Sequence, residues 1–154
     1  MKREMMEKVI AFDMDGTIAD LYNVNNWLEQ LREEKVNPYR DAEPMYDMEE
    51  LGNVLRKLKT LGWKIIVISW GAMNGTRKYT EKVKIAKREW LRKYNFPADK
   101  IHVVKYGTTK HSCCKYAESG ILIDDNEKVR KSWKLGDTIN PDNTLIQKLE
   151  ALIA

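Results

Sequence analysis

Short apolar runs alternate with amphipathic segments along this chain, and this alternation constrains the fold more than any other feature. The apolar runs predict β-strands at residues 9–12, 64–69, 101–104, 121–123 and 137–139. Strands separated by single helices predict right-handed crossovers and a parallel sheet. Because the runs lack polar alternation, they are typical of a sheet covered on both faces. We therefore expect an α/β fold, a Rossmann-like three-layer α/β/α sandwich with a parallel sheet.

Apolar residues at helical spacing predict the segments between the strands. The expected helices cover about 21–31, 47–61, 79–94, 109–118, 129–133 and 140–152. Asp47 is a candidate N-cap, Gly62 a candidate helix end, and Pro141 a candidate first helical residue. Residues 37–44 are predicted as a loop. The irregular stretch of about 16–46 is too long for a plain loop and too short for a second domain.

Length and composition limit the class of protein. The chain has 154 residues, which suits one domain, and 43% apolar residues are enough for a core. Its longest aliphatic run, Ile65–Ile68, is far too short to cross a bilayer, and the first seven residues lack the apolar stretch of a signal peptide. We expect a cytoplasmic protein without a membrane partner. The adjacent Cys113 and Cys114 are interpreted as reduced helix residues, because neither a disulfide staple nor a zinc site suits them.

Basic residues are concentrated in one predicted helix. The net charge is +4, yet the segment 76–94 alone contains eight lysines and arginines and only two glutamates. A basic stripe attracts phosphate-rich partners such as nucleic acids. A solvated helix face gives the same pattern, and we favour that interpretation. Nucleic acid therefore stays a possible but not a favoured partner, and the sequence specifies no oligomeric state.

The segment Asp13-Met14-Asp15-Gly16-Thr17 directly follows the first predicted strand. Gly16 accepts backbone angles that other residues resist, so the chain can turn sharply there. Open α/β sheets bind their ligands at the carboxyl ends of their strands. An acidic turn without function looks similar, because Asp and Gly are common turn residues.

Polar residues also follow the other predicted strands. Ser69 ends the second strand, Lys110 lies shortly after the third, and Asp124 and Asp125 end the fourth. Each has an ordinary alternative as a loop hydroxyl, a surface lysine or a helix cap. In a parallel sheet, however, these strand ends share one edge with Asp13 and Asp15, so we expect the six residues to converge.

Such a cluster has a definite chemistry. Four neighbouring carboxylates repel one another and raise their own pKa values. A divalent cation relieves the repulsion, and Mg²⁺ prefers oxygen ligands together with water and substrate phosphate. The serine and the lysine would bind the remaining phosphate oxygens. The pattern therefore indicates a phosphoryl-transfer centre.

With these residues in order, the chain resembles the haloacid dehalogenase (HAD) superfamily of phosphohydrolases. The resemblance covers nearly the whole chain and rests on the segment 13–17, Ser69, Lys110 and Asp124-Asp125. It implies that Asp13 attacks phosphorus and becomes an aspartyl-phosphate. Asp15 would first protonate the leaving oxygen and then activate the hydrolytic water. An aspartate at this second position is typical of the phosphatases and phosphomutases of the superfamily.

The resemblance also implies ligands. Asp13, the Asp15 backbone carbonyl and Asp124 would hold magnesium, with Asp125 as a further or orienting ligand. Ser69 and Lys110 would bind phosphate, and Lys110 would orient Asp13; Lys105 is the alternative lysine.

Residues 17–46 would form the flap and a small lid of a single HAD-like domain spanning 1–154. The stretches Ser69-Trp70-Gly71, 106–108 and 123–126 are similar to compact nucleotidase-like and phage-type members with a minimal cap. We therefore expect Ser69, Trp70, Gly71 and Lys110 to bind a small phosphorylated substrate, such as a nucleotide. Four aromatic residues are candidates for stacking on a base: Trp27, Tyr39, Tyr46 and Trp70.

Two other functions are consistent with parts of the pattern. Receiver domains of signalling proteins also use clustered acids, a hydroxyl residue and a lysine. Their phosphorylated aspartate follows a middle strand, however, and at that position this chain has Ser69. An enzyme or binder of nucleic-acid ends would use the basic 76–94 helix, and salt-dependent binding would reveal it.

Overall fold

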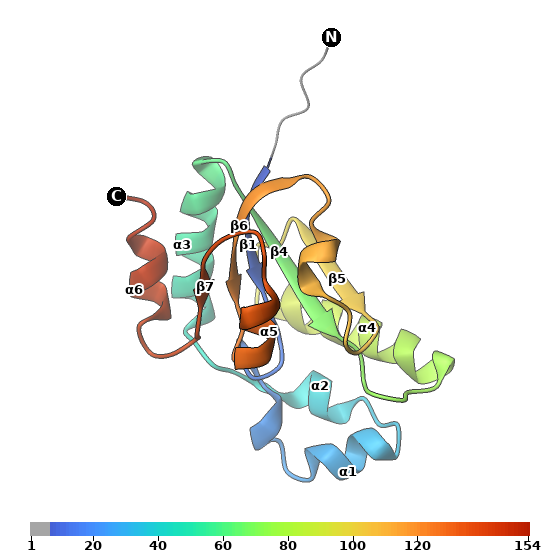
Figure 1. The fold of residues 1–154 in the computed structure, drawn as a ribbon. Helices are drawn as coiled ribbons and strands as arrows, with labels where there is room; N and C mark the ends of the chain where they lie inside the picture. Colours follow the sequence, from blue (N-terminus) through green and yellow to red (C-terminus); the bar gives the residue numbers. More distant parts are fainter. Residues whose placement is uncertain (1–6) are drawn as a thin grey trace.

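Five parallel strands form the centre of the protein in a computed structural model, which describes residues 7–154 (Figure 1). Their order across the sheet is β5-β4-β1-β6-β7. The strands are β1 (Glu7–Phe12), β4 (Trp63–Trp70), β5 (Lys100–Val104), β6 (Ala117–Ile123) and β7 (Thr138–Ile139). The predicted absence of a signal peptide concerns a segment that lies almost entirely outside the described residues.

The predicted three-layer α/β architecture is confirmed. The helices are η1 (Leu21–Asn23), α1 (Trp27–Arg32), α2 (Asn37–Asp41), α3 (Met48–Thr60), α4 (Arg77–Lys93), η2 (Lys110–Cys113), α5 (Glu127–Ser132) and α6 (Leu145–Glu150). Two short strands, β2 (Ala19–Asp20) and β3 (Glu43–Pro44), pair antiparallel where the chain leaves and re-enters the main body. None of the helices in the described part of the chain combines the length and apolar character needed to cross a membrane.

Alternate residues of the strands enter two separate cores. Ile10 and Phe12 of β1 face a core to which α3, α4 and α6 contribute, whereas Val9 and Ala11 face α5. All four β1 residues are buried, as expected for a strand covered on both faces. Burying a side chain as large as Phe12 contributes about 1.5–3 kcal/mol, so the central strand is firmly held.

The register of the sheet places the site residues at one level. Phe12 of β1 lies opposite Val67 of β4 and Ile123 of β6. Asp13 and Asp124 directly follow two of these residues and therefore leave the sheet side by side at its carboxyl edge. Numbered in chain order, the five strands lie as 3-2-1-4-5, which differs from the flavodoxin-like order 2-1-3-4-5.

The stretch between β2 and β3 forms a helical insertion (residues 21–41) beyond the carboxyl edge of the sheet, where Figure 1 shows α1 and α2. It packs on α4 through Leu21 and Tyr39. The Tyr79 hydroxyl of α4 donates to the Lys35 carbonyl at 2.8 Å, and the Glu34 carboxylate accepts from the backbone N–H of Thr76 at 2.8 Å. These bonds fasten the insertion to the start of α4.

Two expectations for this insertion were wrong in detail. The predicted helix over 21–31 is broken into η1 and α1, with Asn26 in the left-handed region at φ 57° between them. The predicted 37–44 loop contains α2, which starts with Asn37 and Pro38. Proline suits the first turn of a helix because its missing N–H and fixed φ carry no penalty there.

Two further helices differ from the prediction. The 109–118 segment forms only the 3₁₀ turn η2, because the chain from Ala117 onward pairs with β1 as strand β6. The last helix starts at Leu145 and not at Pro141, since the Asp142 carboxylate accepts the backbone N–H of Thr144 and forms a turn first. Cys113 and Cys114 are free cysteines, but only Cys113 lies in η2, and Cys114 follows its end.

Candidate active site

The motif loop after β1 is shaped by its glycine. Gly16 has φ +80°, and a Cβ atom there would lie 2.5 Å from Asp125 Oδ2 and 2.6 Å from Tyr22 Cε2. A larger residue would therefore be strained and would also collide with the site. The backbone N–H of Asp13 donates to the Ile123 carbonyl at 2.9 Å, so β6 fixes the position of Asp13.

Three carboxylates gather at this edge of the sheet. Asp13, Asp124 and Asp125 each bring an oxygen atom within 4.8 Å of the other two. Burial and the neighbouring Asp13 charge raise the pKa of Asp124 above its usual range. Burial, a hydrogen bond with Asp13 and the charges of both other acids raise the pKa of Asp125 to about 7. Hard oxygen donors in a crowded anionic cluster suit Mg²⁺, so the three acids fit the predicted metal site.

Lys110 joins two of these acids. Its Nζ atom donates to Asp13 Oδ1 at 2.9 Å and to Asp124 Oδ2 at 2.7 Å. The lysine is 2% exposed. Burial opposes its charge, but the two carboxylates outweigh burial and raise its pKa. Lys105, the alternative lysine, is exposed and belongs to the turn after β5.

Thr17 fixes the other side of Asp13. Its hydroxyl donates to Asp13 Oδ2 at 2.9 Å and accepts the backbone N–H of Asp125 at 3.2 Å. Both oxygen atoms of the Asp13 carboxylate therefore have a partner. Thr17 belongs to the 13–17 motif but was not among the predicted site residues.

A second lysine, Lys87, lies in the middle of α4 and reaches the site from the side. It is 0% exposed. Its Nζ atom donates to Asp15 Oδ2 at 2.8 Å, Ser69 Oγ at 2.6 Å and the Trp70 carbonyl at 2.8 Å. The interpretation of the basic 76–94 segment as a solvated face is therefore wrong for this residue.

Sequence periodicity contained a signal for Lys87. It follows Val83 by four residues and precedes Trp90 by three, so it belongs to the buried face of the helix. The other lysines and arginines of the segment surround Lys87 in sequence, so its net charge does not distinguish this position. A lysine on the apolar stripe of a helix is a candidate site residue, because lysine is almost never fully buried unless it is paired.

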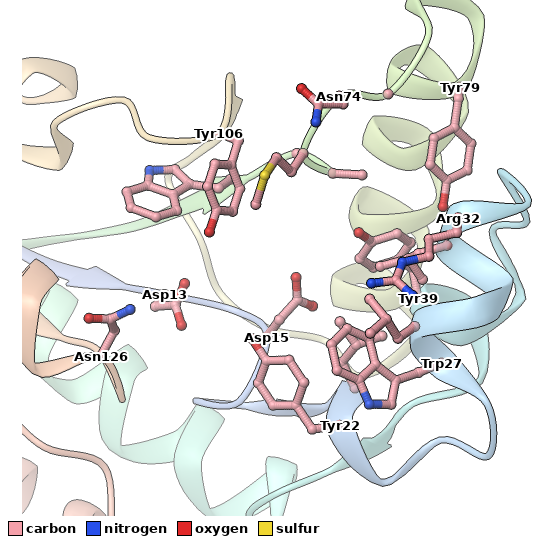
Figure 2. Close-up of a pocket in the computed structure, with 18 of the residues that line it drawn as sticks. Asp13, Asp15, Tyr22, Trp27, Arg32, Tyr39, Asn74, Tyr79, Tyr106 and Asn126 are labelled. Atoms are coloured by element: carbon pink, nitrogen blue, oxygen red, sulfur yellow. The ribbon is translucent and has the colours of Figure 1, made fainter.

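A cavity of about 610 Å³ opens above these residues. Figure 2 shows Asp13 and Asp15 on one wall, Tyr106 across from them, and Trp27, Arg32 and Tyr39 of the helical insertion at one end. The predicted site residues that line the cavity are Asp13, Asp15, Trp70, Gly71, Lys110, Asp124 and Asp125.

Ser69 is the predicted site residue that does not line the cavity. It is 1% exposed, and its hydroxyl oxygen accepts a hydrogen bond from Lys87. Lys87 therefore lies between Ser69 and Asp15. Asp15 itself has a raised pKa, because burial outweighs the stabilising charge and hydrogen bond of Lys87. Asp15 and Asp13 therefore pair with different lysines: Asp15 with Lys87, and Asp13 with Lys110.

Aromatic side chains form much of the cavity wall. Trp27, Tyr39 and Trp70 line it as predicted candidates, whereas Tyr46 lies elsewhere and donates to the Asp142 carbonyl at 2.9 Å. Three further tyrosines line the cavity without having been predicted to do so: Tyr22, Tyr79 and Tyr106, the last of which lies in the stretch 106–108 noted above. They come from three different elements or loops, and no local pattern joins them.

Two pairs of rings are arranged around the acids. Tyr22 contacts Trp27 with ring centroids 4.9 Å apart, and Trp70 contacts Tyr106 with centroids 5.0 Å apart. Burial, followed by the charge of Asp15, raises the pKa of the Tyr22 hydroxyl above its usual range.

Comparison with known proteins agrees with the fold. No family model and no curated protein matches the sequence. Among solved structures, the chain is similar to a protein from Burkholderia xenovorans LB400 described as haloacid dehalogenase-like hydrolase, with TM-score 0.53, 14% identity and coverage of 97% of this chain and 96% of that one.

It is also similar to a D,D-heptose 1,7-bisphosphate phosphatase from Burkholderia thailandensis, with TM-score 0.52, 8% identity and coverage of 96% of each chain. At such low identity these likenesses establish the fold and not the substrate. The chain has the haloacid dehalogenase-like fold that its motifs predict.

Proposed function

We propose that the protein is a magnesium-dependent phosphomonoester hydrolase that forms an aspartyl-phosphate on Asp13. The observation that carries the proposal is the placement of Asp13 at the cavity wall. Lys110 and Thr17 hold its two oxygen atoms there, and Asp124 and Asp125 lie beside it. The likeness to hydrolase and phosphatase structures supports the same reaction class.

The chemistry follows from the two aspartates of the motif. An Asp13 oxygen would attack phosphorus, and the bond between phosphorus and the leaving oxygen would break. Asp15 would give its proton to that oxygen, and its raised pKa favours the protonated form that this step needs. Water would then attack the phosphorus while Asp15 takes a proton from it, which releases phosphate and restores Asp13.

The acid cluster supports a role for a metal ion. Asp13, Asp124, Asp125 and the Asp15 carbonyl would hold Mg²⁺, which would neutralise charge on the phosphate and on the carboxylates. Lys110 would bind a phosphate oxygen as well as orient Asp13. Trp70 and Gly71 would border the phosphate from the end of β4.

The cavity supports a small substrate with a flat ring. Trp27 and Tyr39 of the insertion lie at one end, and Trp70 and Tyr106 lie along one wall. Such faces stack on nucleobases, so a nucleotide is the substrate that we favour. The insertion also lines the cavity, which leaves less room for a duplex end than an open sheet edge would.

A phosphate-release assay with Mg²⁺ tests the proposal. The panel contains mononucleotides, sugar phosphates and oligonucleotides phosphorylated at either end, and Asp13→Asn serves as the inactive control. We expect release from at least one small phosphomonoester by the wild type and none by the variant. Turnover restricted to oligonucleotides, falling steeply as salt increases, would favour the nucleic-acid alternative.

A further inference from the structure

Lys87 lies at a position where the packing of α4 calls for an apolar residue. Its neighbours on that face, Val83, Ala86 and Trp90, are all buried. A buried ammonium loses its hydration, and only pairing with acceptors or opposite charges offsets that cost. An apolar side chain would complete the helix face without that cost, so the packing of α4 does not explain the lysine.

The contacts of the Lys87 ammonium are fully specified. Its three acceptors are Asp15 Oδ2, Ser69 Oγ and the Trp70 carbonyl, all within 2.8 Å. An ammonium has three N–H donors, so each of them has a partner. The Tyr39 ring of the insertion also faces Nζ, with its centroid 4.8 Å away. Two of the acceptors belong to the end of β4, which pairs there with β5.

We propose that Lys87 is a positioning residue that holds the Asp15 carboxylate at the cavity wall. The end of β4 fixes the ammonium, and the ammonium fixes one Asp15 oxygen, so the other oxygen stays directed to the leaving group. Ser69 thereby serves as an anchor for Lys87. This inference rests on the acid–base role proposed for Asp15, and Lys87 acts through that residue without touching the substrate.

Non-additivity distinguishes this role from a general structural one. If Lys87 acts only through Asp15, its removal costs little once Asp15 can no longer transfer a proton. The loss should also depend on the leaving group, because aryl phosphates need less help from an acid than alkyl phosphates do. A packing defect would slow both substrate classes alike.

The test measures release of the leaving group in single turnovers, with an aryl and an alkyl phosphate. Four proteins are compared with the wild type: Lys87→Met, Asp15→Asn, the double variant, and Lys93→Met. The last is a matched control, because Lys93 is an exposed lysine of the same helix. KM is measured as well, to separate positioning of the acid from binding.

We expect Lys87→Met to slow the alkyl phosphate at least about tenfold, the aryl phosphate less, and KM to change little. The double variant should be about as slow as Asp15→Asn alone, and Lys93→Met should match the wild type. Equal losses on both substrates, or losses that multiply in the double variant, would overturn the inference.

The design also covers a folding failure and a failure of the proposed function. If Lys87→Met does not fold, Lys87→Gln keeps a donor, and the double variant contains no unpaired buried charge. Either one supports the inference by showing the same dependence on Asp15, and overturns it by showing none. A wild type that hydrolyses no phosphomonoester would overturn the proposed function and this inference together. An active wild type with losses independent of Asp15 would overturn the inference alone.

Discussion

The two buried lysines of the site make similar contacts but come from different parts of the fold. Lys110 lies in a 3₁₀ turn after β5 and holds Asp13 and Asp124. Lys87 lies in mid-helix and holds Asp15. Lys110 therefore contacts the predicted nucleophile, and Lys87 contacts the predicted acid. The ends of parallel strands bring side chains together by topology, whereas a helix contributes site residues that only the spacing along its buried face reveals.

The largest expected loss of activity follows from changing Asp13, the acid that Lys110 holds. Asp13→Asn should abolish turnover, because an amide oxygen is a poor nucleophile and carries no charge. Phosphate release and a thermal melt of the same preparation check this. Near-normal phosphate release from a folded variant would show that Asp13 is not the nucleophile.

A partial loss is expected at Asp15, the acid that Lys87 holds. Asp15→Asn should slow turnover by about 10²–10⁴-fold, the usual contribution of a general acid or base. The effect on the first step should be smaller for aryl than for alkyl phosphates, as single-turnover rates would reveal. An equal loss for aryl and alkyl phosphates would show that Asp15 is not the acid of the first step.

Magnesium binding should depend on the acids beside Lys110 and not on an acid remote from them. We expect activity to disappear in excess chelator and to return with Mg²⁺. Asp124→Ala should weaken Mg²⁺ binding, measured by calorimetry, far more than Asp41→Ala, an exposed acid of α2. Full activity in chelator would contradict the metal site.

Without metal, the acid cluster should make stability depend on pH. The pKa of Asp125 rises from 3.8 to about 7 on folding, so the folded state binds this proton more tightly than the unfolded state does. The free energy of unfolding in chelator should therefore fall as pH rises through that interval. Mg²⁺ should reverse the trend, because it binds the deprotonated acids and stabilises the folded state. Denaturant melts across this range, with and without Mg²⁺, measure it, and a flat chelator profile would count against the crowded cluster.

The smallest expected effect lies at the far end of α4. Arg92 and Lys93 are exposed in its last turn, away from the cavity. Arg92→Glu combined with Lys93→Glu should change kcat/KM by less than about 0.5 kcal/mol, as ordinary surface changes do. A large, salt-dependent loss on oligonucleotides would instead indicate a nucleic-acid substrate.

The sheet and its edge could be predicted because the signals are local. Apolar runs identify strands, and the residue after each run is then known to lie at the shared edge, as for Asp13 and Asp124. The boundaries of α6 and the existence of α2 were missed because a turn at Asp142 and a helix-starting Pro38 compete with simple periodicity.

The cavity was harder to predict because its wall is assembled from distant segments. Tyr22 and Tyr106 line the same cavity only because the insertion folds over the edge of the sheet. Thr17 and Lys87 differ from them, since each belongs to a pattern already visible in the sequence. Thr17 stands in the acidic motif, and Lys87 stands on the apolar face of its helix.

The most direct test of the central claim is to trap the phosphorylated enzyme. The wild type is mixed with substrate and Mg²⁺, quenched in acid within one turnover, digested and analysed by mass spectrometry. The account predicts a phosphoryl group on Asp13 that forms and decays at rates compatible with turnover, and none in Asp13→Asn. Turnover without any phosphorylated aspartate, or phosphorylation of another residue, would contradict it.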